Sequence, residues 1–122
     1  MEPFMPITQI SGGKMNDITK WKWCGFPHHF VASDKCNYSL ATYVADGNYL
    51  ISTVGDYRPT NDEPVMFGDE YLYETMVFKC DPSVLIDDEP KVFSWGELEK
   101  ALHKTSMEAN LRHVEMCIKY DS

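Results

Sequence analysis

The sequence predicts an α+β fold, in which an antiparallel sheet carries a C-terminal helix, or two helices, packed on one face. Three observations lead to this prediction. Runs rich in β-branched and aromatic residues fill the middle of the chain, an Asp46–Gly47 step separates the first two runs, and the helical signals come last. A chain of 122 residues has room for one such domain, which we expect over residues 15–122.

The first segment, residues 1–14, is expected to be a flexible arm, because two prolines and a glycine pair interrupt regular structure there. Asn16 or Asp17 then predicts the cap of a short helical turn that leads into KWKW, residues 20–23. The start of the chain lacks the basic and apolar regions of a signal peptide. We therefore expect a cytoplasmic protein whose four cysteines are thiols.

Two strands of a hairpin are predicted over residues 37–45 and 48–57. Between them, the Asp46–Gly47 step suits the left-handed backbone conformation that a tight turn needs. In the second strand, alternation places Leu50, Ser52 and Val54 on one face and three partly apolar neighbours on the other. Because both faces are partly apolar, this strand is expected to be central in the sheet.

A loop is predicted over residues 58–69, where two prolines rule out a continuous strand. A third strand follows over residues 71–80. Glu74 shares a face of this strand with apolar residues, so its carboxylate is expected to lie at an edge, to be paired, or to be functional. Residues 81–90 are expected to form turns, and residues 91–93 a brief strand.

Capping-box patterns occur twice near the end of the chain, at residues 94–97 and 105–108. On a helical wheel, Leu98, Leu102 and Ala109 lie on one side. A second group of apolar residues lies about 180° away on the wheel. This group consists of Met107, Leu111, Val114 and Ile118. We therefore expect two helices with a break near residues 104–106, and the second helix is the longer. A single helix between two partners is the alternative.

The charge of the chain is acidic and uneven. The net charge is −8, and residues 56–90 hold ten acids against Arg58 and Lys79. Such a surface repels phosphate backbones, so we expect no direct contact with nucleic acid and a protein with a basic surface as partner. The alternative explanation is that the acidic loops serve only to keep a small protein soluble. No apolar run approaches the roughly 20 residues of a membrane span, so no membrane association is expected.

Four side chains of zinc-ligand type fall within 13 residues of the chain, and they are Cys24, His28, His29 and Cys36. Their spacing matches no standard zinc motif, so we predict neither a metal nor another cofactor. Cys24 and Cys36 are expected to pack as small apolar side chains.

Nucleophilic catalysis is a further possibility for the same region. Cys36 with His28 or His29, oriented by Asp34 or Glu74, would pair a thiolate with an imidazole. No local sequence signature accompanies these residues.

A protein-contact surface is predicted from acids and tyrosines that follow the hairpin. The residues are Asp62, Glu63, Asp69, Glu70, Tyr71 and Tyr73. Ordinary cross-strand packing is the alternative explanation for the tyrosines.

Four motifs also carry a resemblance, namely FPHHFVASDKCNYSLATYV, YLISTVGDY, YLYETMVF and EANLRHVEM. Together they resemble a family of small uncharacterised proteins encoded by phages and prophages, and the likeness extends over residues 21–120. The resemblance implies phage or prophage origin, and it marks His29, Cys36 and Glu74 as polar members of the motifs.

Two functional hypotheses follow. The first is a small acidic accessory protein that binds a host or phage protein without catalysis, with counter-defence as one such role. The alternative is a small enzyme, or a domain that binds a small molecule or metal, built on His29, Cys36 and Glu74. The sequence favours the first hypothesis, and it leaves the oligomeric state open.

Overall fold

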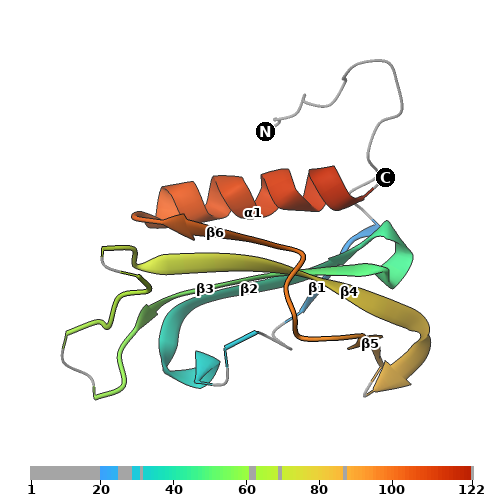
Figure 1. The fold of residues 1–122 in the computed structure, drawn as a ribbon, viewed down its shortest axis with the longest axis horizontal. Helices are drawn as coiled ribbons and strands as arrows, with labels where there is room; N and C mark the ends of the chain where they lie inside the picture. Colours follow the sequence, from blue (N-terminus) through green and yellow to red (C-terminus); the bar gives the residue numbers. More distant parts are fainter. Residues whose placement is uncertain are drawn as a thin grey trace.

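The computed structural model describes residues 20–24, 29–30, 32–60, 63–68, 70–86 and 88–121. A curled antiparallel sheet carries one helix across one face, which confirms the predicted α+β class (Figure 1). The elements are β1 (Lys22–Cys24), β2 (Cys36–Val44), β3 (Tyr49–Tyr57), β4 (Tyr73–Ile86), β5 (Glu89–Val92), β6 (Glu99–His103) and α1 (Ser106–Tyr120). The predicted arm, residues 1–14, and the predicted cap at Asn16 or Asp17 lie outside the described residues.

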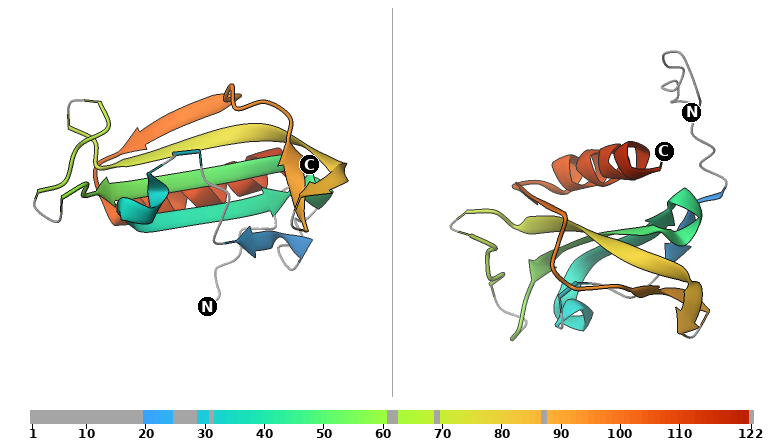
Figure 2. Two further views of the ribbon diagram at one scale, coloured as in Figure 1. Left: turned by 90° about the horizontal axis from the view of Figure 1, so that it is seen from below. Right: turned by 45° about the vertical axis from the view of Figure 1, so that its right-hand side comes forward.

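The strands are ordered β1-β2-β3-β4-β5, and β6 also pairs with β4. All pairings are antiparallel. Besides β3, the long strand β4 has two further partners, because its first half pairs with β6 and its second half with β5 (Figure 2). β3 lies between β2 and β4, so the prediction that the second hairpin strand is central is confirmed.

The predicted hairpin is also confirmed. β2 and β3 are joined by a tight 3-10 turn, Ala45–Gly47, and their register pairs Tyr43 with Leu50. Asp46 and Gly47 have φ values of 55° and 89°. These left-handed conformations reverse the chain within three residues, and aspartate and glycine accept them more readily than most residues do.

α1 begins as the second capping box predicts. Thr105 Oγ1 accepts a hydrogen bond from the backbone N–H of Glu108 at 3.1 Å, and a carboxylate oxygen of Glu108 accepts one from the N–H of Thr105 at 3.3 Å. The prediction of the first of the two helices is wrong, since Glu99–His103 forms β6 and pairs with Tyr73–Val77 of β4. The sequence of β6 suits a helix, but ladder hydrogen bonds along an open edge of β4 outweigh this local propensity.

Lys22–Cys24, which begins within KWKW, forms β1 on the edge of β2, and residues 16–19, where the helical turn is expected, lie outside the described residues. One further expectation needs correction. Residues 81–86 were expected to form turns, yet they continue β4 beyond the predicted end. The ladder between β4 and β5 shifts register between Asp81 and Leu85, and such an irregularity lets a strand contain Pro82.

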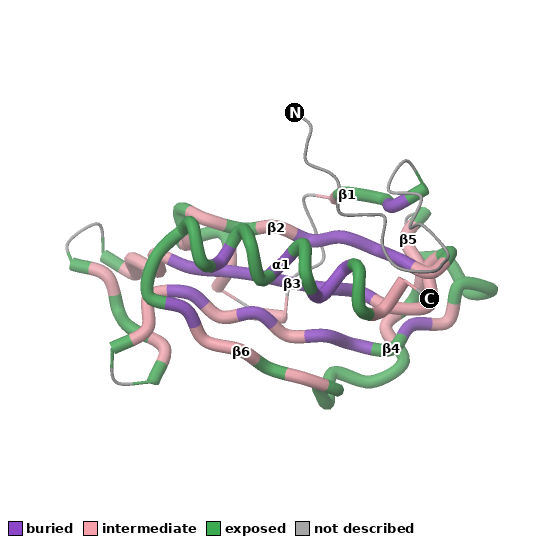
Figure 3. The backbone as a smooth tube through the Cα atoms, turned by 90° about the horizontal axis from the view of Figure 1, so that it is seen from above, coloured by how far each residue is buried: buried purple, intermediate pink, exposed green. Residues whose placement is uncertain are grey.

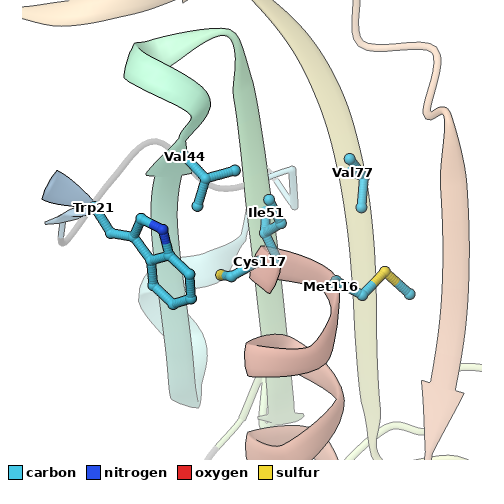
Figure 4. Packing of buried hydrophobic residues seen from close by; sticks show 6 residues of the cluster. All are labelled: Trp21, Val44, Ile51, Val77, Met116 and Cys117. Carbon is cyan, nitrogen blue, oxygen red and sulfur yellow. The ribbon is translucent and has the colours of Figure 1, made fainter. Parts of the chain in front are cut away.

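The core has two layers, one on each face of the sheet. Between the sheet and α1 lies a cluster of Trp21, Val44, Ile51, Val77, Met116 and Cys117 (Figure 4). On the opposite face lies a second cluster of Ala41, Tyr43, Leu50, Phe78 and Cys80. Both layers bury residues of β3, which is why the centre of the sheet is its most buried part (Figure 3).

Candidate functional site

A hydrogen-bonded group of three side chains lies on the sheet face opposite α1. The register places Ser52 of β3 and Glu74 of β4 on this face, beside the second core cluster. His29 precedes β2 in the chain, and its ring lies on this face because it bonds to Ser52 and Glu74. Its Nδ1 lies 2.9 Å from Ser52 Oγ, and its Nε2 lies 3.0 Å from Glu74 Oε1.

The hydrogen bonds of this group favour one arrangement of protons. The backbone N–H of His29 also donates to Ser52 Oγ, at 3.1 Å. Because a carboxylate oxygen accepts hydrogen bonds, Nε2 is the donor to Glu74 and carries the proton. In the neutral imidazole, Nδ1 then accepts the hydroxyl proton of Ser52. Glu74 is therefore paired, which is one of the three outcomes that its position in the strand predicted.

The order hydroxyl, imidazole, carboxylate is also that of a nucleophile, a base and an orienting acid. Here the burial of these side chains argues against a catalytic role. Ser52 has no exposed surface, and the His29 side chain is only 3% exposed. The ring of His29 also packs near Phe78 of the second core cluster, with centroids 6.1 Å apart. These hydrogen bonds fasten His29 to the sheet, and in this conformation the Ser52 hydroxyl is not accessible to a substrate.

Cys36, the third residue of the predicted set, is not part of this group. It pairs with Tyr57 in the ladder, and strand alternation directs it to the face that carries α1. Its thiol lies 3.9 Å from the carbonyl oxygen of Ala32. Burial raises the pKa of the Cys36 thiol to about 11, so it is protonated and weakly nucleophilic at neutral pH. The structure joins His29 to Glu74 and leaves Cys36 apart from them.

The candidate metal ligands are separated in the same way. The thiol of Cys24 donates a hydrogen bond to Glu89 at 3.1 Å. Burial and this carboxylate raise the pKa of the Cys24 thiol to about 12. His28 lies outside the described residues. Across the ranges that the structure describes, no three histidine, cysteine or acidic side chains gather in a way that could hold a metal ion.

A second polar group lies under α1 and was not predicted. His113 of α1 lies at 2.7 Å from Thr53 Oγ1 through Nδ1 and at 2.8 Å from Thr42 Oγ1 through Nε2. Thr53 Oγ1 lies 2.6 Å from Thr75 Oγ1, which in turn lies 2.9 Å from His103 Nε2. We call these five residues the threonine–histidine chain. Its members come from five elements, and all of them are buried.

The sequence contains only a weak signal for the threonine–histidine chain. Thr42, Thr53 and Thr75 each alternate with apolar residues on a predicted strand, where a threonine is an ordinary choice. Only the register, which aligns Thr53 with Thr75, and the packing of α1 bring the hydroxyls to His113. A threonine on each of two neighbouring strands, with a histidine in a following helix, is the pattern that could have suggested it.

The predicted contact surface is supported at some positions and not at others. Glu63 and Glu70 are exposed, and Glu70 pairs with Lys104 at 3.2 Å. Tyr71 is half-buried, with the Lys104 ammonium 5.8 Å from its ring centroid. Tyr73 is buried, because its ring covers Gly55 and packs edge-on against Tyr38, so its side chain offers little surface to a partner. Asp62 and Asp69 lie outside the described residues.

Among the described residues, no helix is long and apolar enough to cross a membrane. Comparison of the chain with protein-family models, with curated proteins and with solved structures gave no match.

Proposed function

We propose that this chain is a non-catalytic binding protein of phage or prophage type, located in the cytoplasm, that acts on a host or phage protein with a basic surface. Counter-defence is one role that such binding would serve. The proposal draws on the sequence resemblance, on the net charge of −8 and on the distribution of polar groups in the fold.

One observation supports binding over chemistry. The side chains best suited to acid–base or nucleophilic work are buried and bonded to one another, in the group around His29 and in the threonine–histidine chain. Exposed positions instead hold acids such as Glu63, Glu70 and Glu97. Exposed acids steer and hold a basic partner, whereas saturated buried groups are not free to act on a substrate.

The experiment is capture of a partner from a bacterial lysate by the immobilised full chain. Glu63→Lys with Glu70→Lys changes the net charge from −8 to −4 on the predicted contact surface. Asp34→Lys with Glu97→Lys makes the same change at exposed positions elsewhere and serves as the control. We expect the first variant to recover roughly fivefold less of the partner than the control does, because opposite rim charges set association.

Two results would contradict the proposal. Equal recovery by both variants would mean that the acids at positions 63 and 70 do not form the contact. A wild-type chain that retains no protein at low salt would remove the binding function itself.

The alternative is a small enzyme, and the distances from His29 to Ser52 and Glu74 are what favours it. An enzyme of this kind needs the Ser52 hydroxyl to become accessible. Covalent labelling of Ser52 by a fluorophosphonate, located by mass spectrometry and absent from Ser52→Ala, would favour the enzyme over the binding protein.

A further inference from the structure

The outward side of α1 carries an apolar row that the sheet does not cover. The helix buries Ala109, His113, Met116 and Cys117 against the sheet. The outward residues are Met107, Leu111, Val114 and Ile118, which are 70%, 62%, 40% and 38% exposed. We call these four residues the α1 row. Figure 3 shows exposed stretches of α1 that recur along its whole length.

The spacing within the α1 row is 4, 3 and 4 residues, which follows from the positions of its members. This alternation averages 3.5 residues and is the spacing of the seam of a coiled coil. A seam of this kind accepts the side chains of a second helix as knobs into holes. The row therefore suits an α-helical occupant better than a strand or a loop.

The two sides of the α1 row differ in the chemistry of the residues that flank it. On the side towards β2, Asn110 accepts a hydrogen bond from the hydroxyl of Tyr38. Trp23 of β1 lies on this side, with its ring centroid 5.7 Å from that of His113, and it is 51% exposed. It extends the apolar surface beyond the helix.

The other side of the row is acidic. Helical spacing places Glu108 and Glu115 directly beside it. The cations of the helix lie further round and are engaged, since Arg112 lies 3.5 Å from Glu115 and Lys119 lies 2.8 Å from Glu99 of β6. Since Arg112 offsets Glu115, the net negative charge of this rim comes from Glu108.

These charges disfavour a second copy of the chain as the occupant. In an antiparallel pairing of two α1 rows, Glu108 of one copy would face Glu115 of the other. The two chains would also each bring a net charge of −8. Like charges at such positions destabilise a helix pair, whereas lysine or arginine would pair with them.

We infer that the α1 row, with Trp23, is the docking surface for an amphipathic helix whose apolar seam is flanked by lysine and arginine. The inference rests on the proposed binding function and names the surface and the partner chemistry. Apolar side chains of the partner helix fill the row, and its basic flank lies along Glu108 and Glu115.

The test uses two labelled synthetic peptides of equal length with leucine at their seam positions. One peptide has lysine at the flanking positions and the other has glutamate. We expect fluorescence anisotropy to give at least about tenfold tighter binding of the lysine peptide to the wild-type chain. Met107→Gln with Leu111→Gln should weaken that binding at least about tenfold, because two apolar contacts are lost.

The matched control is Leu85→Gln with Ile86→Gln, at positions that are 57% and 56% exposed on β4. It removes similar apolar surface away from α1 and should leave binding unchanged. Circular dichroism checks that both variants fold. Equal affinity for the two peptides, or unchanged binding by the Met107→Gln, Leu111→Gln variant, would overturn the inference. A wild-type dimer in sedimentation that this variant dissociates would also overturn it, in favour of a second copy.

The failure of this inference can be told apart from the failure of the proposed function. If the lysate partner is still captured by the Met107→Gln, Leu111→Gln variant, the protein binds a partner through another surface and only the inference fails. If the wild-type chain captures no partner, the binding function fails.

Discussion

At the scale of single residues, Thr53 shows how the buried polar groups depend on one another. Its hydroxyl lies within hydrogen-bond distance of both Thr75 and His113. It can donate to one and must accept from the other, so the direction of each bond fixes the next. Removing one member therefore leaves a buried group without its partner, which costs about 1–3 kcal/mol.

His103 gives this group a pH dependence. Burial, and next the nearby Arg112 guanidinium, lower the pKa of His103 below its usual 6.5, while Glu108 acts weakly in the opposite direction. The native state then binds fewer protons than the unfolded state as the pH falls below about 6.5. We expect the free energy of unfolding to decrease there, by up to about 1.4 kcal/mol per pH unit for this group.

Urea unfolding between about pH 5 and pH 7.5 measures this effect. His103→Gln keeps a side chain that can bond to Thr75 and removes the titration. Its stability should fall less steeply with acid than that of the wild type. Parallel slopes for the two proteins would show that His103 does not carry the effect.

At the scale of elements, the pairing of β3 with β4 depends on a glycine. Gly55 lies opposite Tyr73, and a Cβ at position 55 would come within 2.0 Å of Cδ2 of the Tyr73 ring. The ring is fixed there by Tyr38, which packs edge-on against it at a centroid distance of 5.1 Å. The close approach of ring to backbone is possible only without a side chain.

Gly55→Ala should therefore destabilise the protein by about 2–3 kcal/mol, because the Tyr73 ring must leave its buried place. Chemical denaturation measures the change. Adding Tyr73→Leu should make the effect of Gly55→Ala smaller than it is in the wild-type background, as a double-mutant cycle would detect. Additive effects of the two substitutions would contradict the steric explanation.

The helix illustrates a different limit of the sequence. Its capping box follows from a local signal and is confirmed. Periodicity also identifies Met107, Leu111, Val114 and Ile118 as an apolar side. The sheet nevertheless covers the side that contains His113, because the threonines of β2 and β3 bond to that ring.

At the scale of the whole molecule, net charge is the dominant electrostatic property. The chain has 19 acidic against 11 basic side chains, and folding brings them closer together. Salt shortens the Debye length from about 30 Å at 0.01 M to about 8 Å at 0.15 M. We expect the free energy of unfolding to rise by roughly 0.5–1 kcal/mol over this range, because self-repulsion is screened.

Thermal or urea unfolding in NaCl and in KCl checks this expectation, and both salts should act alike. Asp34→Lys with Glu97→Lys reduces the net charge and should show a smaller salt effect. Stability that stays constant or falls with salt would contradict the role of net charge.

The candidate site was predictable only in part. Glu74 stood out because a carboxylate shared a strand face with apolar residues, and the structure pairs it with His29. The sequence groups Cys36 with them as a polar residue inside otherwise apolar motifs, yet alternation along β2 directs it to the other face. Ser52 carried no signal, since a serine among apolar strand residues is common.

The sequence by itself determined the features that arise from neighbouring residues. These are the hairpin at Asp46–Gly47, the central place of β3 and the capped helix from Ser106. Only the tertiary structure decided that Glu99–His103 is a strand, that His29 meets Ser52 and Glu74, and that α1 turns His113 inward. The physical reason is that these features depend on partners more than 20 residues away, and local propensity contains no information about them.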